Sequence, residues 1–363
     1  MKKVTSTDVA RMAGVSQATV SMVLNNKVGP SFSEETKNKV LDAAARLGYS
    51  LPAQGNIKSL RNLITVMVPT LTNPFYTHLA SNIERCALAA GYKIMICNTL
   101  RNKEYEAYYL DYLSSTKVAG IIFTFVPSYP QLVEQLSVSL PIILIGEKTE
   151  ELSIPSIELN NIKAGIIMGE HLLSLGHRHF AFFTTPQNSM SLARKQREEG
   201  LRQALLKAGL DGKIEIYADS AAEEHDLGSL PFEYETGYAL AKRFLSGGGK
   251  ATALIAVNDM MALGLLRCLA DNGKKVPGEF SVSGFDNIFS GRISSPEITT
   301  IDHHLDLRAQ SAVDMILSKL AKDKKSEGSF EITPEVNRIE YMPQLVIRGS
   351  TGKNVGNKSF LRR

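Results

Sequence analysis

The stretch VTSTDVARMAGVSQATVSMVLNN, residues 4–26, places short hydroxyl side chains among small apolar residues at helical spacing. Thr5 and Asp8 fit a capping box at the start of a first helix, and Gly14 ends that helix about two turns later. Ser16 then caps a second helix. The apolar faces comprise Val9, Ala10 and Ala13, then Ala18 or Thr19 with Val20, Val23 and Leu24. The stretch therefore predicts two short helices joined by a tight glycine turn.

A third helix is expected after a break at residues 30–33. Ser33 is its N-cap, Gly48 ends it, and it carries the apolar residues Val40, Leu41, Ala44 and Leu47. Two short helices joined by a tight turn and braced by a third form a helix-turn-helix, which docks on DNA. We therefore expect residues 1–49 to form an all-α helix-turn-helix domain.

The second predicted helix has an exposed face of short side chains, which suits entry into a major groove roughly 12 Å wide. This face carries Gln17, Ala18, Ser21, Met22 and Asn25. Hydroxyl groups suit the phosphate contacts that fix the register of a helix on the duplex. The hydroxyls in this region belong to Thr5, Ser16, Thr19 and Ser21. These residues could instead be only N-caps of a small helical bundle, but three caps at these spacings and the glycine turn favour DNA binding.

The composition and the charge distribution agree with a small basic module on a larger body. The 363-residue chain exceeds the usual size of a single core, so two or three domains are expected, and its 44% hydrophobic residues are ordinary for a globular protein. Residues 1–61 hold nine basic and four acidic side chains, and the last fourteen residues hold four basic and no acidic side chains. With a net charge of +4, the middle of the chain is mildly acidic. This asymmetry is weak evidence for a polyanion-binding head.

Membrane proteins, secreted proteins and disulfide-stabilised proteins are disfavoured. No apolar run approaches the ~18 residues of a membrane span. The N-terminus lacks the apolar core of a secretory signal, so we expect a cytoplasmic protein. The cysteines show no paired spacing and are expected to be small buried hydrophobes in a reducing compartment. They are Cys86, Cys97 and Cys268.

The sequence predicts no catalytic centre, no metal site and no cofactor. Residues 246–250, SGGGK, precede a predicted strand and lack the first glycine of a phosphate-binding loop. His303 and His304 are adjacent, so their side chains diverge, and no cysteine lies nearby. A G-x-S-x-G nucleophile motif is also absent from the sequence.

From residue 63 onward, short β-rich runs alternate with helical stretches. The runs span residues 63–68, 92–98, 118–125, 140–146, 179–185, 213–218, 251–257 and 280–285. Continuous apolar strands separated by helices predict parallel sheets covered on both faces, and the runs fall into two similar groups. We therefore expect an α/β body of two doubly wound lobes, with a ligand cleft at the carboxyl ends of their strands.

The head carries the pattern D-V-A-x-x-A-G-V-S-x-x-T-V-S-x-V-x-N over residues 8–25. The body carries PTLTNPFY (69–76), LGH (175–177), REEG (197–200), VNDMMALG (257–264) and GFD (284–286). On these residues the chain resembles the lactose repressor (LacI/GalR) family of bacterial transcription regulators, over roughly residues 3–348. The resemblance implies a periplasmic-binding-protein-like body and a ligand-responsive DNA-binding repressor, whose effector is a sugar or related metabolite by default.

The resemblance also implies which residues of the head read bases. In this family the second helix reads bases mainly through the positions occupied here by Gln17, Ala18 and Met22. An arginine that pairs with guanine is common at the third position. Met22 could offer only apolar contact to a thymine methyl group, which leaves the operator sequence open.

The resemblance implies a hinge over residues 50–62, in which a leucine wedges into the minor groove. Leu60 resembles that wedge, and Lys58 is expected to contact phosphate whatever the base sequence. Ile57 departs from the family pattern and Gly55 weakens any helix, so a flexible linker is the alternative.

Expected domain boundaries follow from the resemblance and the strand pattern. The effector-binding body covers residues 63–349, with an N-terminal lobe of about 63–160 and 292–322 and a C-terminal lobe of about 161–291 and 323–349. Residues 350–363 are expected to form a basic disordered tail, without the long leucine-rich segment that would hold two dimers together.

Carried over by position, the expected effector-binding residues come from both lobes. They are Phe75 and Tyr76 from the N-terminal lobe, Arg197, Phe232, Asn258 and Asp286 from the C-terminal lobe, and Glu147 as a weaker candidate. Asp286 would accept and Arg197 would donate hydrogen bonds to a hydroxylated or ionised ligand, while an aromatic ring covers an apolar face. Two alternatives stay open: Arg197 and Asp286 could simply pair across the cleft, and Asn258 could be a helix N-cap.

The leading hypothesis is a homodimeric regulator whose two heads read two half-sites of a near-palindromic DNA operator. An effector in the cleft would change operator affinity by a coupling free energy of ~1–3 kcal/mol, either as an inducer or as a corepressor. The alternatives are a transport-type solute-binding protein with the same body and an enzyme on a doubly wound fold. The missing secretory signal and the lack of a catalytic constellation disfavour them.

Overall fold

The structure is a computed structural model that describes residues 4–24, 32–47, 49, 60–116, 118–147, 149, 151–186, 191–210, 212–218, 231–323 and 338–354. The chain divides into two compact units, Met1–Leu60, which we name the head, and Arg61–Arg363, which we name the body. Within the described residues, no helix combines the length and apolar character that a membrane span requires.

The head consists of helices α1 (Ser6–Ala13), α2 (Gln17–Leu24) and α3 (Glu34–Leu47), which confirms the predicted helices. The Thr5 amide donates to the Asp8 carboxylate at 2.9 Å, and Gly14 adopts a φ of 67° that ends α1. The Ser16 hydroxyl accepts from the Thr19 amide at 3.0 Å and caps α2. The buried core of the head is Val9, Ala10, Val20, Val40, Ala43 and Ala44.

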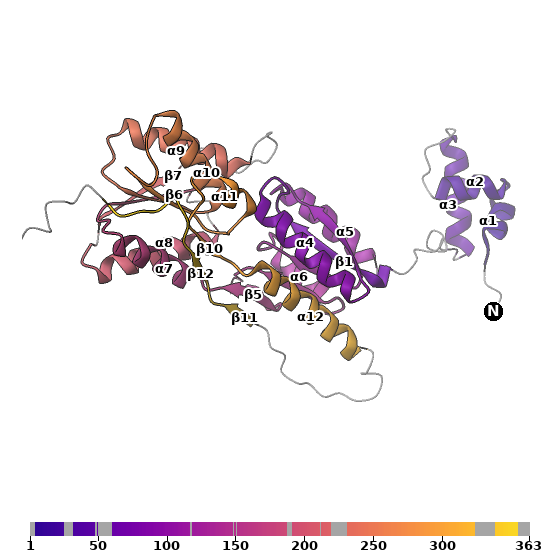
Figure 1. The fold of residues 1–363 in the computed structure, drawn as a ribbon. Coiled ribbons are helices and arrows are strands. Elements are labelled where there is room, and N and C mark those ends of the chain that lie inside the picture. The colour runs from indigo at the N-terminus through magenta and orange to yellow at the C-terminus, as the bar shows by residue number, and fades with distance from the viewer. Residues whose placement is uncertain are drawn as a thin grey trace, which may run out of the picture. The chain divides into compact units, whose positions relative to one another are not determined.

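The N-terminal lobe of the body is built on a parallel sheet. Its elements are β1 (Leu63–Val68), α4 (Pro74–Ala89), β2 (Lys93–Asn98), α5 (Lys103–Ser115), β3 (Gly120–Phe123), α6 (Pro130–Ser137), β4 (Ile142–Ile145), β5 (Ser156–Leu159), α12 (Leu305–Asp323) and β11 (Arg338–Tyr341). The strand order is β11-β5-β4-β3-β1-β2, and α12 packs against α4 on one face (Figure 1). The order reverses between β1 and β3, which makes the carboxyl ends of these strands the topological switch point.

The C-terminal lobe has a second parallel sheet in the order β7-β6-β8-β9. Its elements are α7 (Asn161–Ser174), β6 (Phe180–Thr184), α8 (Leu192–Lys207), β7 (Ile214–Ala218), α9 (Phe232–Ser246), β8 (Ala253–Ala256), α10 (Asp259–Asp271), β9 (Ser281–Ser283) and α11 (Phe289–Ile293). Helices α7 and α8 pack together, as do α9 and α10. The switch point of this sheet lies between β6 and β8. The eight predicted runs all contain strands, so the expected pair of doubly wound lobes is confirmed.

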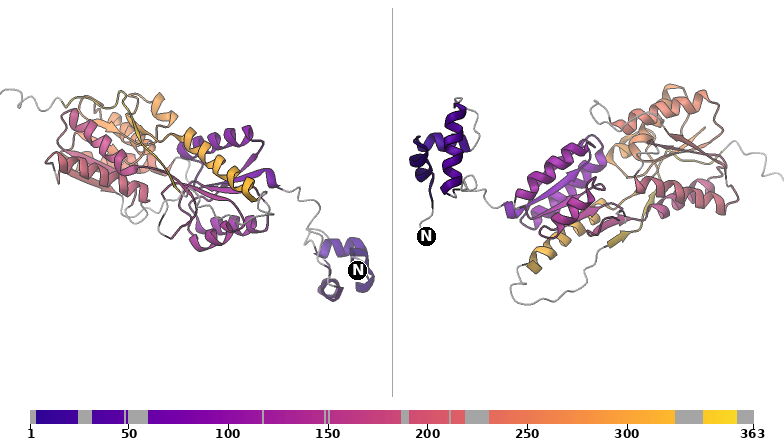
Figure 2. Two further views of the ribbon diagram at one scale, coloured as in Figure 1. Left: turned by 90° about the horizontal axis from the view of Figure 1, so that it is seen from below. Right: turned by 180° about the vertical axis from the view of Figure 1, so that it is seen from behind.

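The chain passes between the lobes more than once, which ties them together (Figure 2). It leaves the N-terminal lobe after β5, returns into α12 after β10 (Thr300–Asp302), and leaves again after β11 for β12 (Gln344–Val346). Strands β10 and β12 pair antiparallel as a separate two-stranded sheet. The sequence pattern did not predict β5, β10, β11 or β12.

The observed lobe boundaries differ from the expected ones in the last part of the chain. Residues 323–349 were expected in the C-terminal lobe, yet β11 pairs with β5 and so joins the N-terminal sheet. Residues 292–322 were expected in the N-terminal lobe, yet Ile298 belongs to the core of the C-terminal lobe and Thr299 bridges Ser283. Strands of three or four residues carry too few side chains to specify which sheet they join.

The expected disordered tail is wrong for residues 350–354. The Ser350 side chain is fully buried, and its hydroxyl donates to the Val282 carbonyl at 2.6 Å, beside β9. Residues 355–363 lie outside the described residues. The three cysteines are buried and unpaired, as predicted.

Helices α7 and α8 approach so closely that glycine is required at their contact. A Cβ atom on Gly200 would lie 1.9 Å from the Ile162 carbonyl oxygen, and one on Gly165 would lie 2.1 Å from the Arg197 carbonyl oxygen. Neither position can accept a side chain unless the helices separate. This contact fixes the position of α8, and therefore of the Arg197 side chain, against the rest of the lobe.

Candidate functional site

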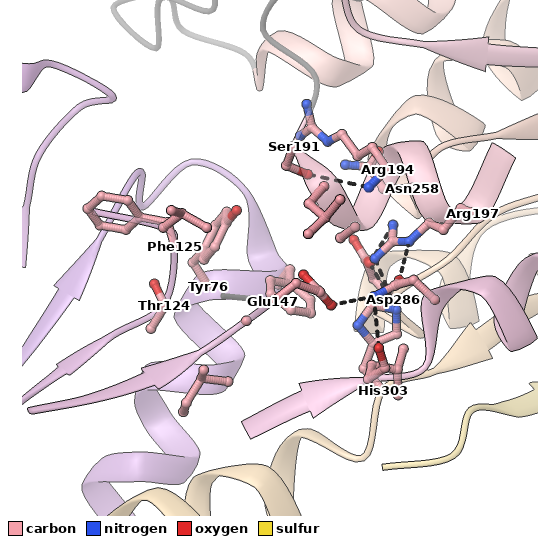
Figure 3. A pocket seen from close by; sticks show the side chains of 18 of the residues that line it. Tyr76, Thr124, Phe125, Glu147, Ser191, Arg194, Arg197, Asn258, Asp286 and His303 are labelled. Carbon is pink, nitrogen blue, oxygen red and sulfur yellow. Dashed lines mark hydrogen bonds and ion pairs between the residues drawn. The ribbon is translucent and has the colours of Figure 1, made fainter. Parts of the chain in front are cut away.

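A cavity of about 430 Å³ lies within the body, between the two lobes (Figure 3). Its walls include residues that follow β1 and β3 in one lobe and β6 and β8 in the other, so both topological switch points open onto it. Figure 3 shows residues of the N-terminal lobe, Tyr76, Thr124 and Phe125, facing Ser191, Arg194 and Asn258 across the cavity. The volume falls in the usual range for small-molecule sites.

The structure brings most of the predicted cleft residues to this cavity. The lining includes Phe75, Tyr76, Glu147, Arg197, Asn258 and Asp286. Phe232 is the exception: it is the first residue of α9 and is not part of the lining formed by the described residues.

Arg197 is held in the wall by several hydrogen bonds. Its Nε donates to Asn161 Oδ1 at 2.9 Å and its NH1 to the Val257 carbonyl at 2.7 Å, while its NH2 lies 3.3 Å from His303 Nε2. The guanidinium also lies 5.0 Å from the centre of the Phe285 ring. These contacts hold the cation rigidly at the edge of the cavity.

Asp286 interacts only loosely with Arg197 and His303 beside it. Its Oδ1 lies 3.6 Å from Arg197 NH1 and 3.5 Å from His303 Nε2, and both distances exceed an ordinary hydrogen bond. Arg197 and Asp286 do lie beside each other, but both belong to the C-terminal lobe, so the alternative of a pair across the cleft is wrong. Burial raises the pKa of Asp286 to about 7, although Arg197 acts in the opposite direction. The carboxylate therefore keeps its capacity to accept hydrogen bonds from a ligand.

The backbone at Asp286 is strained in a way that aims its side chain. Its φ is 115° and that of the following Asn287 is 54°, both in the region that favours glycine. The Asp286 amide donates to the Ile301 carbonyl at 3.0 Å, and the Asn287 amide donates to the Thr300 hydroxyl at 3.2 Å. Strand β10 therefore holds the turn that carries this carboxylate.

Asn258 is a helix N-cap that also lines the cavity. Its Oδ1 accepts from the Met261 amide at 2.9 Å at the start of α10, as the alternative interpretation expected. Its Nδ2 has no hydrogen-bond partner among the described residues. The side chain can therefore cap the helix and still donate to a ligand.

The N-terminal lobe supplies an aromatic wall. The Phe75 ring meets Tyr76 edge to face at 5.1 Å and His303 edge to face at 5.4 Å. Burial lowers the pKa of His303 well below its ordinary value, so this imidazole is neutral near pH 7. An apolar face of a ligand would lie against these rings.

Glu233 joins the two lobes at one rim of the cavity. Its Oε1 accepts from Arg194 at 3.1 Å within the C-terminal lobe. The same oxygen accepts from Arg101 at 3.2 Å and from Asn73 Nδ2 at 3.3 Å, both in the N-terminal lobe. The Glu233 side chain is 1% exposed, so these charge-assisted bonds are shielded from water. They stabilise the closed arrangement of the lobes.

Glu147 and Asn161 link the lobes on another side. The Asn161 amide nitrogen donates to Glu147, which follows β4, and its oxygen accepts from Arg197 on α8. Burial raises the pKa of Glu147, and the charge of Arg308 acts against this rise. Arg308, in the first turn of α12, donates from NH2 to the Ile157 carbonyl at 3.1 Å.

The cavity includes residues that the sequence patterns did not single out. They are Asn73, Arg101, Thr124, Phe125, Asn161, Ser191, Arg194, His303 and Arg308. A local signal existed for some: Asn73 directly precedes the proline that starts α4, and Thr124 and Phe125 end a predicted strand run. Arg101 and Arg308 had no local sequence signal, because contacts between distant parts of the chain bring them to the cavity.

The head presents the predicted face of α2. Gln17, Ala18, Ser21 and Met22 are exposed, and the Gln17 amide nitrogen donates to the Ser6 hydroxyl at 2.8 Å. The hydroxyls of Thr5 and Ser16 are engaged locally, with Asp8 at 2.6 Å and with Thr19 at 2.9 Å. Two further predicted residues, Asn25 and Lys58, lie outside the described residues, and Leu60 begins the short 3₁₀ helix Leu60–Asn62.

His303 and His304 diverge as the sequence predicts. His303 faces the cavity, whereas His304 Nε2 lies 3.1 Å from the Met342 carbonyl oxygen. In the part of the chain that the structure describes, no group of three or more histidine, cysteine or acidic residues could hold a metal ion.

Comparison with known proteins assigns both units. Residues 5–51 match the family described as bacterial regulatory proteins, lacI family. Residues 61–343 match the periplasmic binding proteins and sugar binding domain of the LacI family. The HTH-type transcriptional repressor PurR of Mannheimia succiniciproducens is 30% identical over 352 residues, which cover 95% of this chain and 98% of the relative.

Solved structures share the fold. A LacI family transcriptional regulator from Enterococcus faecium with bound ribose has a TM-score of 0.66 at 24% identity, over 80% of this chain and 99% of that one. The lac repressor dimer bound to operator and the anti-inducer ONPF has a TM-score of 0.64 at 24% identity, over 97% and 100%. The chain belongs to the LacI family of bacterial transcription regulators and is a ligand-responsive, sequence-specific DNA-binding protein.

Proposed function

We propose that this chain is a cytoplasmic, homodimeric repressor without catalytic activity, in which a small hydroxylated effector bound in the cavity changes the affinity of the paired heads for operator DNA. The observation that carries the proposal is the convergence of Arg197, Asp286 and Asn258 with the aromatic wall of the opposite lobe. This set offers donors, an acceptor and an apolar face.

The exposed face of α2 supports the DNA half of the proposal. Gln17 and Met22 lie on that face, and Val20 anchors the helix in the core of the head. Two such heads in a symmetric dimer would read two half-sites of the operator. The lac repressor, whose fold this chain shares, is a dimer in its complex with operator.

The effector half is supported by the position of the cavity between the lobes. A ligand there touches both lobes at once, so its binding free energy depends on how closed the lobes are. The ribose held by the regulator from Enterococcus faecium makes a sugar or a sugar derivative the first class to test. The coupling free energy between the cavity and the heads can have either sign. Measurement therefore decides whether the ligand weakens or strengthens operator binding.

A gel-shift titration tests the proposal. The full-length chain is first used to select its operator from random duplexes, and the dissociation constant is then measured at several salt concentrations with and without ligand. We expect a specific complex, a steep salt dependence, and a ligand effect on the order of 5- to 150-fold.

Arg197→Ala provides the matching variant. Without this guanidinium the ligand loses its best-positioned donor, so we expect operator binding as in the wild type and no response to the ligand. The cavity assignment is wrong if that variant still responds at the ligand concentration that suffices for the wild type.

A further inference from the structure

Arg308 is a buried cation in the cavity wall that forms no ion pair with any described residue. Its exposed fraction is 3%, and within the described residues its side chain makes a single hydrogen bond, from NH2 to the Ile157 carbonyl. Its Nε is buried and has no hydrogen-bond partner in the described part of the chain. A buried guanidinium in this condition is costly, unless a ligand provides the missing acceptor.

The other cavity arginines have acidic neighbours. Arg101 and Arg194 share Glu233, and Arg197 lies beside Asp286. Arg308 is influenced by the charge of Glu147, but the hydrogen bond of that carboxylate goes to Asn161 instead. Among the arginines of the cavity, Arg308 therefore has the positive charge that is least neutralised by a neighbouring carboxylate.

The cavity as a whole carries a positive surplus. Among the described residues, four arginines line it, against two lining carboxylates, Glu147 and Asp286, and the buried Glu233 that pairs with Arg101 and Arg194. Burial raises the pKa of both lining acids, and it raises that of Asp286 to about 7, so the negative charge of Asp286 is incomplete at neutral pH. A neutral ligand would leave this imbalance in place, whereas an anionic ligand would remove it.

We propose that the effector carries a carboxylate that binds to Arg308, and that it is a small sugar acid. The Nε edge of the guanidinium would donate to the carboxylate, while Asp286 and Asn258 would bind hydroxyl groups at the opposite wall. A singly charged carboxylate suits this site better than a phosphate dianion, because Glu147 and Asp286 repel the second charge. This proposal rests on the proposed function, since it assumes that the cavity is the effector site.

Matched ligand pairs test the proposal on the full-length chain. D-glucose is compared with D-glucuronate and D-gluconate, D-galactose with D-galacturonate, and glucose 6-phosphate serves as the phosphate probe. Binding is measured by thermal shift and by calorimetry at pH 7.5. We expect at least one acid to bind about 10- to 100-fold more tightly than its neutral parent, the factor expected from one hydrogen bond to a charged group.

Variants assign the preference to Arg308. Arg308→Met keeps the length of the side chain and removes its charge, so we expect the acid to lose about 10- to 100-fold in affinity while the neutral parent does not. Arg308→Lys restores part of the preference, because it keeps the charge but not the planar fork. Arg267→Met is the control, since Arg267 is a surface residue 63% exposed that pairs with Asp271 on its own helix.

Each result decides the proposal. It is overturned if no acid of the set binds, if a neutral sugar or glucose 6-phosphate binds more tightly than every carboxylate, or if Arg308→Met leaves the acid-to-neutral ratio unchanged. Gel shifts with the same ligands separate this outcome from failure of the proposed function. If a neutral sugar changes operator affinity, only the proposal that the effector carries a carboxylate is overturned. If an acid binds through Arg308 without changing operator affinity, only the proposed coupling between the cavity and DNA binding is overturned.

Discussion

We expect the bonds of Glu233 across the rim of the cavity to contribute to the free energy of lobe closure. Arg101→Met removes the 3.2 Å bond that Arg101 makes from the N-terminal lobe, and Glu233 keeps its bond to Arg194 inside its own lobe. A hydrogen bond to a charged group contributes about 1.5–3 kcal/mol. Because the Arg101 side chain is 15% exposed, we take the lower end, about 1.5 kcal/mol, which changes the closed-to-open ratio about tenfold.

Lobe closure can be followed by energy transfer between dyes on the two lobes. Lys93→Cys on β2 and Lys207→Cys at the end of α8 provide exposed labelling sites, one in each lobe. The native cysteines are buried and so are shielded from the dye. We expect Arg101→Met to widen the distance distribution without ligand and to weaken effector binding up to tenfold, since ligand affinity scales with the closed fraction.

A second ion pair of the same kind provides the control. Arg338 pairs with Glu158 at 2.8 Å inside the N-terminal sheet, so Arg338→Met removes a bond that does not cross the cavity. We expect no change in lobe distance with this variant. The reasoning fails if Arg101→Met leaves the distance distribution unchanged, or if Arg338→Met shifts it by the same amount.

Three further predictions concern pH, helix contact and base reading. Burial raises the pKa of Asp286 to about 7, so between pH 4 and pH 7 the folded chain keeps a proton that the unfolded chain releases, and the free energy of unfolding falls as pH rises. Asp286→Asn should make the fall in the free energy of unfolding between pH 4 and pH 7 smaller by roughly 4 kcal/mol, at about 1.4 kcal/mol for each pKa unit. Equal pH dependence of urea unfolding in the variant and the wild type would contradict this prediction. Gly200→Ala should lower the free energy of unfolding in urea by about 1–3 kcal/mol, because its Cβ would lie 1.9 Å from the Ile162 oxygen. The same variant should weaken effector binding by moving Arg197, and unchanged stability and affinity would refute the close contact. Gln17→Ala should change which operator is selected from random duplexes, and equal loss on every DNA would exclude Gln17 as a base reader.

The secondary structure of the head could be predicted because its signals are local. The capping residues Thr5, Ser16 and Ser33 and the turn residue Gly14 act within a few positions of themselves. The structure places the starts of α1, α2 and α3 and the end of α1 beside them. The buried strands of the body were predicted for a similar reason, since continuous apolar runs suit strands covered on both faces.

Short edge and crossing strands escaped prediction. β5 contains the buried Glu158, whose carboxylate accepts from the Ser156 hydroxyl and pairs with Arg338 from β11. A charged residue argues against a buried strand until its partner is known, and that partner lies far along the chain. The lobe membership of β11 depends on the same long-range pair.

The residues of the cavity also fall into a group that the sequence predicted and a group that it did not. Arg197, Asn258 and Asp286 lie in family motifs and were placed at the cleft from sequence, although their contact with a ligand stays a prediction. Arg101 and Arg308 carry no motif and become cavity residues only when α12 returns to the N-terminal lobe and when the lobes close.

The segment around β10 explains why a ligand in this cavity would couple to lobe movement. Strand β10 holds the strained turn of Asp286 through the Ile301 carbonyl. The chain then passes His303 and enters α12 at Leu305, and Arg308 lies in the first turn of this helix. A ligand bound to both Asp286 and Arg308 therefore spans the lobes beside one of the places where the chain crosses between them. Because opening would separate these two contacts, the ligand favours the closed arrangement by the free energy of whichever contact would be lost.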